Sequence, residues 1–572
     1  MEAPNTHEWR YRQEDIELSN SISKRLSIHP LLSRILVARG FYDPTDVYEF
    51  LNPNLRQLHD PFFMKDMDKA VNRIGEALGS GEKILVHGDY DVDGITSTAL
   101  LYSVLKEEEN GSKISYNLPS RYDGGYGLSR DVIEAASGDG RDLIITVDCG
   151  IRSIQEVEFA REKDIDIVIT DHHEPGGSLP RAVSVVDPKR PDCRYPFKEL
   201  SGVGVVFKLA QALEIEDVVK TDPRDYLELV ALGSIADLVP LVNENRTLTR
   251  YGLEMLGSTG RVGLAALMRE CGINPSKGIG SADVAFRLAP RLNAAGRMGH
   301  PDLALELLLT DDRVDSDLFA RELNTLNFKR QSIGKKLVES ILETIRIEGL
   351  ADDPGIVVAG SDWNPGVLGT SASRIVEMTG KPAIILNIED GIAKGSGRAP
   401  KGFDLINALT GLRSLLLEYG GHERAAGLTL PTGNVDQLRE LFNHHIIDRY
   451  PDMEFIPVMD IDLDLTLKEL DMEGVRSFDL LDPSGVGNPY PTISLREVMV
   501  GYDVNAVGDG KHLKFSIQDD FGSVGCIWFN KGELYDAIRP GLLVTIAGQP
   551  SINSWQGEDS VQIKIIDLEV IE

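Results

Sequence analysis

Between residues 83 and 173, three apolar runs alternate with segments of helical periodicity, and each run ends in acidic or histidine residues. The runs are KILVHGD, DLIITVDCG and IDIVITDHH, and the segments between them include ITSTALLYSVLKEEE and SIQEVEFAREKD. Runs that are apolar throughout predict strands buried on both faces, which is typical of a parallel sheet covered by helices. Such sheets bind ligands at the carboxyl ends of their strands, which is where Asp89, Asp148 and Asp171 lie.

The rest of the chain divides by pattern into further domains, and its 572 residues suggest about three or four of them. The stretch SDLFARELNTLNFKRQSIGKKLVESILETIRIEG predicts a long charged helix, and GIVVAGS and PAIILNIEDG begin a second strand–helix pattern. Short strands separated by Gly, Asp and Asn turns predict a small β-barrel in the tail. The predicted class is α/β, with a helical segment (1–60), a parallel-sheet domain (61–260), a helical connector (261–350), a smaller α/β domain (351–450) and a β-barrel (455–572).

The net charge is −31, from 59 Lys and Arg against 90 Asp and Glu. Nucleic-acid-binding domains are usually basic, so this balance counts against a nucleic-acid substrate. The objection is limited, because a groove can be locally basic on an acidic body and bound cations bring their own positive charge.

No apolar run approaches the roughly 20 residues that a membrane span requires. The start, MEAPNTHEWRYRQED, lacks the basic and apolar regions of a signal peptide. The four cysteines are scattered without CxxC spacing, which argues against a disulfide framework and a zinc knuckle. These features favour a cytoplasmic protein with no membrane partner.

Acidic and histidine residues cluster at the expected strand ends. Asp89, Asp91 and Asp93 occupy every second position after the first run, so three like charges lie within a few ångströms of one another. Carboxylates at that spacing repel unless some are protonated, a conflict that divalent cations remove. Carboxylates and imidazoles without thiolates favour manganese or magnesium over a structural zinc site. Gly94 and Gly150 leave room for the backbone to approach a phosphate.

Each motif alone has a simpler explanation. GDYDVDG is compatible with a calcium-like or solvated loop, DHH with a helix cap followed by surface histidines, and Asp237 with a helix N-cap. Their joint occurrence favours catalysis, because His87, His172 and His173 are three of only 11 histidines and all lie at strand ends of one predicted sheet.

These segments resemble the DHH phosphoesterase superfamily, and within it the exonucleases specific for single strands. The resemblance covers nearly the whole chain, and its segments are HGDYDVDGITSTALL, SRYDGGYGLS, TVDCGIRS, TDHHEP, GSIADLVPL, RLNAAGRMGHPDLALELL, GSGRAP and GGHERAAGLTL.

The resemblance implies two divalent cations, manganese preferred or magnesium. The implied ligands are His87, Asp91, Asp93, Asp148, His172 and Asp237. Asp91 and Asp148, with His87, would hold the first cation, and the others together with Asp148 the second, which makes Asp148 the bridge. Asp89 and His173 lie beside them, and with Asp148 they form the predicted catalytic group.

The second α/β domain resembles the DHHA1 substrate-binding module. The implied substrate-binding residues are Arg121, Arg297, Ser396, Arg398, Gly420, Gly421 and His422. Glycines let backbone approach the nucleic acid, and a hydroxyl beside a guanidinium suits phosphate capture. A surface salt bridge explains any one of these arginines equally well, and a simple turn explains the glycines. One departure is Asn364, where the family often has a histidine, which puts substrate handling there in doubt but not the activity.

The tail resembles the OB-fold of these exonucleases. Such barrels bind single strands in a basic groove with aromatic stacking, and Trp528, Phe529 and Trp555 are the candidate platforms. Alternation in CIWFN directs either Trp528 or Phe529 into the core, and the acidic QDD does not favour DNA binding. A protein partner is therefore an alternative ligand for the tail.

The resemblance implies a two-metal exonuclease on single-stranded DNA, 5′→3′ in polarity, that acts in DNA repair and recombination. RNA stays open as a substrate, and the expected partners are single-strand-binding, helicase or replication proteins. A second hypothesis keeps the site but changes the substrate to short oligoribonucleotides or cyclic dinucleotides, which need neither the connector nor the tail. A third, a non-catalytic replication scaffold, is disfavoured because no metal ligand is missing.

Overall fold

The computed structural model describes residues 7–108, 113–119, 127–451, 456–555 and 557–571. The chain forms two compact units. Unit 1 comprises residues 1–51, 333–481 and 490–572. Unit 2 comprises residues 52–332 and 482–489.

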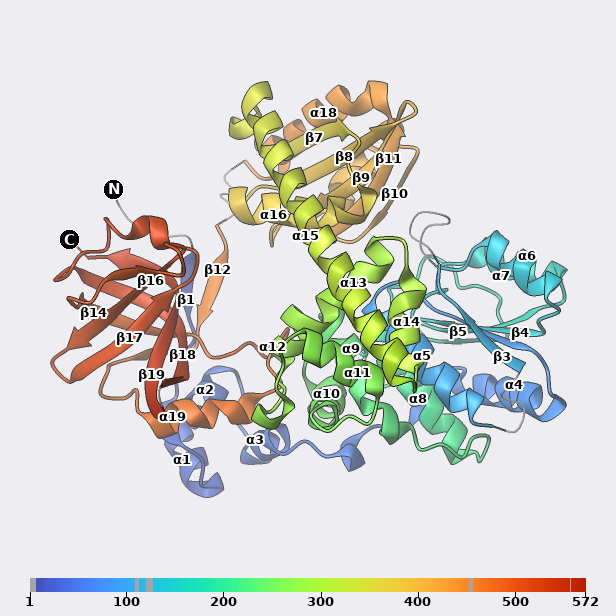
Figure 1. The fold of residues 1–572 in the computed structure, drawn as a ribbon, viewed down its shortest axis with the longest axis horizontal. Coiled ribbons are helices and arrows are strands. Elements are labelled where there is room, and N and C mark those ends of the chain that lie inside the picture. Colours follow the sequence, from blue (N-terminus) through green and yellow to red (C-terminus); the bar gives the residue numbers. More distant parts are fainter. Residues whose placement is uncertain (1–6, 109–112, 120–126, 452–455, 556, 572) are drawn as a thin grey trace. The chain divides into compact units, whose positions relative to one another are not determined.

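Unit 2 contains a five-stranded parallel sheet in the order β3-β2-β4-β5-β6 (Figure 1). Its strands are β2 (Ile84–His87), β3 (Ile114–Asn117), β4 (Leu143–Val147), β5 (Asp166–Thr170) and β6 (Ser184–Val186). The helices that cover it are α4 (Met67–Ser80), α5 (Val92–Lys106), α6 (Arg130–Gly138) and α7 (Ile154–Glu162). The three apolar runs are β2, β4 and β5, which confirms the predicted parallel sheet.

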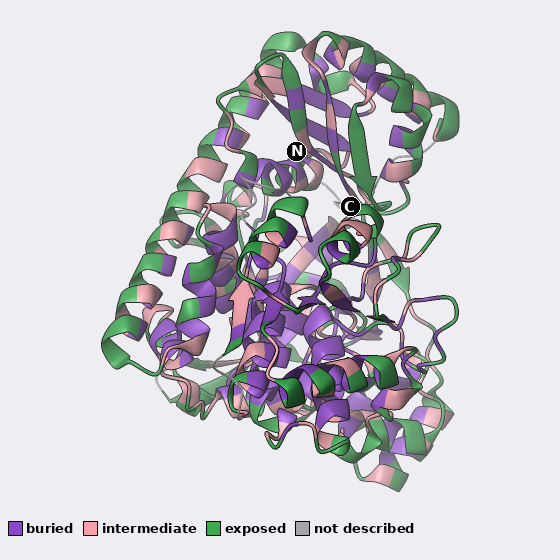
Figure 2. Cartoon of the chain, turned by 90° about the vertical axis from the view of Figure 1, so that its right-hand side faces the viewer, coloured by how far each residue is buried: buried purple, intermediate pink, exposed green. Residues whose placement is uncertain are grey.

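Both faces of this sheet are buried. Val86 and Ile145 share one core with α4 and α5, whereas their neighbours Leu85 and Ile144 share the other with α6 and α7. Successive strand residues point to opposite faces, so a sheet covered on both sides requires runs without polar interruption. Buried residues accordingly line the interior, and exposed residues cover the outer helix faces (Figure 2).

A helical layer completes unit 2. Its helices are α8 (Gly202–Ile215), α9 (Leu227–Ala236), α10 (Asn243–Leu256), α11 (Val262–Glu270), α12 (Ser281–Asp283), α13 (Ala289–Arg297) and α14 (Pro301–Leu309). α8, α9 and α14 pack around α5, which explains why α5 is apolar or small on nearly every side. The expected long helix is α15 (Arg313–Glu348), whose residues up to 332 belong to unit 2 and whose remainder belongs to unit 1.

Within unit 1, a five-stranded mixed sheet in the order β10-β11-β9-β8-β7 forms the smaller α/β domain. Its strands are β7 (Ile356–Ser361), β8 (Ala383–Glu389), β9 (Ile392–Arg398), β10 (Glu418–Gly421) and β11 (Ala425–Pro431). Its helices are α16 (Pro365–Thr379), α17 (Leu405–Gly411) and α18 (Val435–Arg449). α17 and α18 bury one face of the sheet, and α16 packs on β8 and β9.

The tail of unit 1 is a β-barrel, as predicted. Its strands are β13 (Leu463–Leu465), β14 (Ile493–Val500), β15 (Asn505–Val507), β16 (His512–Asp519), β17 (Gly522–Trp528), β18 (Leu543–Trp555) and β19 (Glu558–Val570). Because β14 pairs with both β18 and β16, the strands β14, β18, β19, β17 and β16 close into a ring.

The N-terminal segment packs on this barrel. Its helices are α1 (Ile16–Leu26), α2 (Pro30–Ala38) and α3 (Pro44–Leu51), and Leu32 shares a core with Phe515 of the barrel. The segment was expected to be helical, but it also contains β1 (Glu8–Tyr11), which pairs in parallel with β12 (Val458–Ile461). A strand whose partner lies so far along the chain leaves no local hairpin signal. In the described part of the chain, every helix is too short or too polar to cross a membrane.

Candidate metal centre

Five of the six predicted metal ligands, Asp91, Asp93, Asp148, His172 and Asp237, lie close together at the carboxyl edge of the sheet in unit 2. Asp89 follows β2, and Asp148 and Asp171 follow β4 and β5 directly. The chain continues from β2 to β3 on one side and later to β4 on the other, so β2 and β4 flank the switch point where doubly wound sheets bind ligands. Asp237 enters the same region from the C-terminal end of α9.

Among the residues that the structure describes, three groups of side chains have ligand atoms within 4.8 Å of one another. The groups are Asp89 with Asp91 and Asp148, Asp93 with His172 and Asp237, and Asp148 with His172 and His173. Nε2 of His172 lies 3.1 Å from Oδ1 of Asp148 and 3.6 Å from Oδ2 of Asp237. It also lies 3.8 Å from Oδ2 of Asp93. Asp148 and His172 therefore join the groups into one cluster.

The buried atoms of this cluster suit divalent cations. Oδ1 of Asp89 and Nε2 of His172 are buried and form no hydrogen bond within the described residues. Burial, reinforced by neighbouring carboxylates, raises the pKa of Asp93 to about 7 and also raises the pKa values of Asp148 and Asp237. Burial lowers the pKa of His172 to about 3, which keeps its imidazole in the neutral form that binds metals. Cations would neutralise the repulsion between the neighbouring carboxylates and would coordinate the two buried atoms. The oxygen-rich donor set fits manganese or magnesium.

Sharp backbone turns present these side chains. Asp148 has a φ of 60°, a left-handed conformation that non-glycine residues rarely adopt outside functional sites. Gly150, at a φ of 110°, has no room for a side chain, because its Cβ would lie 2.7 Å from Oγ1 of Thr146. At Gly94 a Cβ would lie 2.5 Å from the backbone oxygen of Asp89. The glycines of both motifs thus allow close packing within the metal loops.

Two helix N-termini meet at the carboxylates. Oδ1 of Asp91 accepts hydrogen bonds from the N–H groups of Asp93 and Gly94, both at 3.1 Å, and so caps α5. Both oxygens of Asp93 accept from the start of α8, one from Gly202 N–H at 2.7 Å and the other from Val203 N–H at 2.8 Å. Free amides and the helix dipole favour negative charge at such positions.

Gly202 also lies against Asp148, because a Cβ at this position would lie 2.4 Å from Oδ1 of that carboxylate. Nothing in the sequence marked Gly202 as functional, since it opens the apolar stretch GVGVVF far from the acidic motifs. The only local signal is Ser201, which N-caps α8 through a hydrogen bond from Gly204 N–H at 3.1 Å.

Asp171 has a role that the sequence motif did not reveal. Its Oδ1 accepts from the backbone N–H of His172 at 2.7 Å and lies 2.7 Å from Nδ1 of His173, and its Oδ2 accepts from Ile151 N–H at 2.9 Å. Burial opposes charge on His173, but the hydrogen bond and the charge of Asp171 outweigh it and raise the His173 pKa to about 9. The same contacts overcome burial at Asp171 and lower its pKa to about 2. Asp171 therefore holds His173 as a cation at the edge of the cluster.

Helix α13 packs against the segment after β2 that carries Asp89, Asp91 and Asp93. Oδ1 of Asn293 accepts a hydrogen bond from Val92 N–H at 3.3 Å. A Cβ on Gly296 would lie 2.4 Å from the backbone oxygen of Tyr90, so the helix can approach only with glycine there. Arg297, a predicted substrate-binding residue, is the next residue and ends the helix.

His87 lies outside the three groups. Its Nδ1 is 3.0 Å from Oδ1 of Asn117, its Nε2 is 3.3 Å from the backbone oxygen of Gly127, and burial lowers its pKa. Its assignment as a further ligand stays a prediction.

The predicted substrate-binding residues of the smaller α/β domain lie on neighbouring strands of unit 1. The strand register places Ser396 of β9 opposite Gly427 of β11, and Gly427 opposite Gly420 of β10. Nη1 of Arg398 donates to Oγ of Ser396 at 2.6 Å. Among the described residues, a Cβ on Gly420 would meet no atom within 4 Å, and one on Gly427 a single atom at 4.0 Å. The result is an open glycine floor that crosses two strands and reaches the one that carries Arg398.

Gly421 ends β10, the edge strand of this sheet, and His422 follows it. Gly421 has a φ of 143°, and a Cβ there would lie 2.2 Å from the backbone oxygen of Ala425. Nδ1 of His422 accepts a hydrogen bond from Arg424 N–H at 3.3 Å. Asn364 N-caps α16 through its Oδ1, which accepts from Gly366 N–H at 2.8 Å.

Other predicted positions differ in what the structure allows. Arg121 and the side chain of Trp555 lie outside the described residues. Trp528 is buried in the barrel, whereas Phe529 is half exposed and contacts His512, so alternation assigns Trp528 to the core.

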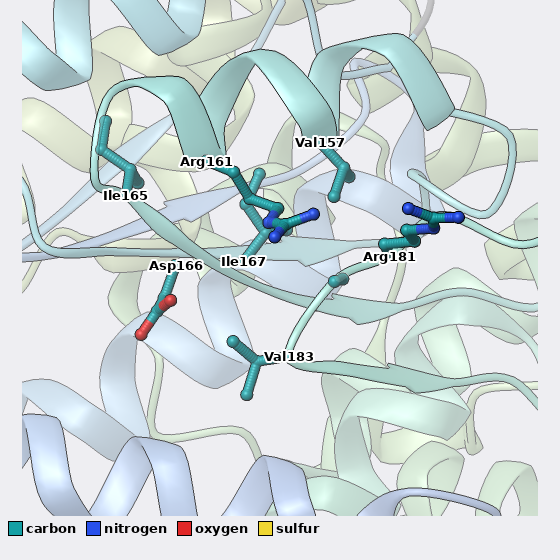
Figure 3. A pocket seen from close by; sticks show the side chains of 8 residues that line it. Val157, Arg161, Ile165, Asp166, Ile167, Arg181 and Val183 are labelled. Atoms are coloured by element: carbon teal, nitrogen blue, oxygen red, sulfur yellow. The ribbon is translucent and has the colours of Figure 1, made fainter.

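A surface pocket of about 310 Å³ lies where β5 begins (Figure 3). It is lined by Val157, Arg161, Ile165, Asp166, Ile167, Arg181, Ala182 and Val183. Asp166 begins β5 whereas Asp171 follows its end, so this pocket has no part in the chemistry of the carboxylate cluster.

Family models match three segments of the chain. The DHH family, N-terminal domain, matches residues 83–234, the DHHA1 domain matches residues 352–448, and the RecJ OB domain matches residues 461–567.

Two curated relatives and two solved structures match nearly the whole chain. The single-stranded-DNA-specific exonuclease RecJ of Bacillus subtilis is 40% identical over 99% of this chain and 71% of that protein. The protein of the same name from Haemophilus influenzae is 33% identical over 98% of this chain and 99% of that protein. The crystal structure of RecJ in complex with Mn²⁺ from Thermus thermophilus superimposes with a TM-score of 0.84 at 30% identity, covering 99% of this chain and 80% of that chain. The Mg²⁺ complex from the same organism gives 0.78 at 29% identity, with 99% and 78% coverage.

Proposed function

The chain belongs to the RecJ family of single-stranded-DNA-specific exonucleases, and we propose that it hydrolyses phosphodiester bonds of single-stranded DNA with two divalent cations, manganese preferred or magnesium. The proposed polarity is 5′→3′, and the proposed setting is DNA repair and recombination. The alternative substrates are RNA, short oligoribonucleotides and cyclic dinucleotides.

One observation carries this proposal. The neutral imidazole of His172 faces carboxylates from three separate elements, Asp93 of α5, Asp148 after β4 and Asp237 after α9, at 3.1 to 3.8 Å. Packing alone gives no reason to bury three acids around an imidazole that cannot neutralise them. A metal-binding role supplies that reason and disfavours a non-catalytic scaffold.

The proposed ligands are those that the family resemblance implies. They are His87, Asp91, Asp93, Asp148, His172 and Asp237. Two cations, when bound, lower the pKa of an attacking water and neutralise charge on the phosphoryl oxygens. Asp148 lies in two of the candidate groups and is the proposed bridge, and Asp89 shares one of them.

His173 supplies a charged hydrogen-bond donor, which an ionised carboxylate cannot provide. Because Asp171 keeps its pKa near 9, the ring is protonated at neutral pH and donates a hydrogen bond to the scissile phosphate. Arg297, at the end of the helix that supports the metal loop, contacts an adjacent phosphate.

The smaller α/β domain holds the end of the strand. Arg398 and Ser396 form one polar group on β9, and the open floor at Gly420 admits the sugar–phosphate backbone beside it. His422 and Gly421 continue the same edge, and Arg121 is the remaining proposed contact. The barrel binds single-stranded DNA, with Phe529 as its exposed aromatic candidate.

The test is degradation of end-labelled single-stranded DNA by the purified protein and by Asp148→Ala, with manganese or magnesium. We expect release of mononucleotides from the 5′ end by the wild type, and loss of at least about a thousandfold in the variant with the fold intact. Circular dichroism and the melting temperature of the variant provide the folding control.

Parallel reactions separate the alternatives. Single-stranded RNA, a cyclic dinucleotide, duplex DNA and single-stranded circles are supplied under the same conditions. Rapid cutting of circles or duplex would contradict the exonuclease proposal, and preference for a cyclic dinucleotide would support the alternative substrate. Substantial manganese-dependent activity in Asp148→Ala would contradict the ligand assignment.

The domain division, the location and the protein partners complete the proposal. We propose the five-part division at residues 1–60, 61–260, 261–350, 351–450 and 455–572, and a cytoplasmic location. Single-strand-binding, helicase or replication proteins are the proposed protein partners.

A further inference from the structure

A short segment of the tail belongs structurally to the catalytic unit. Residues 482–489, DPSGVGNP, lie between barrel strands β13 and β14 in sequence, yet they are part of unit 2. Backbone oxygens of this segment accept hydrogen bonds from unit 2. The bonds are Arg250 Nη1 to Asp482 O at 3.1 Å, Arg246 Nη1 to Pro483 O at 3.5 Å, Ser281 Oγ to Ser484 O at 2.6 Å and Leu241 N–H to Val486 O at 2.7 Å.

The last of these bonds fixes the connector that follows Asp237. This connector, residues 238–242, joins α9 to α10, and it begins with Leu238 in the left-handed region at a φ of 59°. Such a conformation in a leucine persists only when its surroundings hold it. Three further bonds tie the connector to its own helices: Leu238 N–H donates to Ile235 O at 3.3 Å, Nδ2 of Asn245 donates to Pro240 O at 3.1 Å, and Arg246 N–H donates to Val242 O at 3.2 Å. The bond to Val486 is the one that comes from residues 482–489.

The segment fits the connector closely. A Cβ on Gly485 would lie 2.8 Å from Cδ1 of Leu241, which is buried. Gly487, at a φ of 74°, would place a Cβ 3.1 Å from Cβ of Pro240 and 3.4 Å from Cγ1 of Val242. The segment is also internally tied, because Gly485 and Asn488 exchange two backbone hydrogen bonds at 2.8 and 3.1 Å.

We infer that residues 482–489 position Asp237 and are therefore required for full affinity of the cation that this carboxylate binds. The inference rests on the proposed function, since it concerns the same metal centre. If the segment is displaced, Leu241 N–H loses its acceptor and the connector relaxes, which moves the carboxylate relative to His172 and Asp93. Groups that orient a ligand from behind typically change metal affinity by about 10- to 100-fold.

The test measures manganese binding by the full chain, using isothermal titration calorimetry and the electron paramagnetic resonance of free Mn²⁺. The wild type is expected to bind two ions. Gly487→Val is expected to weaken one of them by about 10- to 100-fold and leave the other unchanged, with nuclease activity restored at raised manganese. Gly278→Val is the matched control, because Gly278 also has a positive φ, 80°, in unit 2, but no atom of the described part of the chain lies within 4 Å of its Cβ position.

Ser281→Ala provides a second variant from the other side of the contact, because it removes the donor to Ser484 without any added bulk. Weakening of one ion by a few-fold, with little change in the other, would support the inference even if Gly487→Val fails to fold. Equal affinities in wild type and both variants would overturn it, as would equal weakening of both ions together with a lowered melting temperature. A wild type that binds no pair of ions would instead contradict the proposed function.

Discussion

Two adjacent histidines in the candidate metal centre differ in charge at neutral pH, because burial dominates at His172, whereas the hydrogen bond and the charge of Asp171 outweigh burial at His173. The rings of His172 and His173 lie 4.5 Å apart, centroid to centroid. Burial lowers the pKa of His172 to about 3, while Asp171 raises that of His173 to about 9. One ring is thus suited to bind a metal and the other to donate a charged hydrogen bond, a division that the letters DHH do not show.

Substitution of Asp171 by asparagine tests this division. Asparagine keeps an acceptor but removes the charge, so the pKa of His173 should fall from about 9 towards its ordinary value of about 6.5. A basic group whose pKa is raised stays protonated until the pH passes the raised value. Between about pH 6.5 and 9 the imidazole of His173 should therefore be neutral in the variant, whereas it stays protonated in the wild type. We expect kcat at pH 8 to fall by about tenfold or more relative to the wild type, with a smaller loss at pH 6. An equal loss at both pH values would show that the charge of His173 is not involved.

At the scale of secondary-structure elements, the N-terminus of α8 organises two carboxylates at once. Gly202 and Val203 donate to both oxygens of Asp93, and the bare Cα of Gly202 lets Asp148 lie beside them. The helix therefore fixes the distance between an acid of α5 and the proposed bridge.

Gly202→Ala should push these groups apart, because its Cβ would lie 2.4 Å from Oδ1 of Asp148. We expect weaker manganese binding by calorimetry and at least about a hundredfold loss of kcat/KM on single-stranded DNA. The matched control is Gly79→Ala in α4, where no atom of a described residue lies within 4 Å of the Cβ position and alanine should stabilise the helix by about 0.5–1 kcal/mol. Full activity in Gly202→Ala would rule out this role for α8.

The elements that could be predicted are those whose signal is local. The strands β2, β4 and β5 follow from continuous apolar runs, and the acids at their ends follow from where parallel strands finish. The DHHA1-like sheet and the barrel are also visible as runs of short strands separated by turns. The sequence therefore predicts that Asp89, Asp148 and His172 lie near one another, and the structure places Asp148 in one group with Asp89 and in another with His172.

The remainder depends on contacts between distant residues. Gly202 meets Asp93 only after the sheet has brought α8 to α5, and an apolar run gives no sign of that contact. The pairing of β1 with β12 and the transfer of residues 482–489 to unit 2 are equally non-local. Asn293 supports the start of α5 by accepting a hydrogen bond from Val92 N–H. A residue with such a purely supporting role belongs to no recognisable sequence motif.

At the scale of the whole molecule, an acidic body is combined with a site for an anionic polymer. The net charge of −31 repels DNA at long range, so binding has to rely on local positive charge from the cations, helix N-termini and individual arginines. The chain also passes repeatedly between the two units, so a cut before the barrel would remove residues 482–489 from the catalytic unit.

Removal of the cations should destabilise unit 2, which contains the carboxylate cluster, and the loss of stability should depend on pH. Asp93 has a pKa of about 7 in the fold without metal, against an ordinary value near 4, so the folded state holds a proton that the unfolded state releases. Stability without metal must then fall as the pH rises towards and through about 7. Cations take the place of these protons, so the melting temperature with manganese should exceed that with chelator by several degrees more at pH 8 than at pH 6.5.

Hydrogen exchange would locate this effect within the chain. Because the carboxylates all lie in unit 2, chelation at pH 8 should lower protection in α5, α8 and β4 but leave the β8 and β9 strands of unit 1 unchanged. Asp93→Asn is the control, since the amide removes one of the titrating groups and should flatten the dependence of the metal-free melting temperature on pH. A uniform loss of protection in both units would mean that the cations stabilise the whole chain and not the carboxylate cluster.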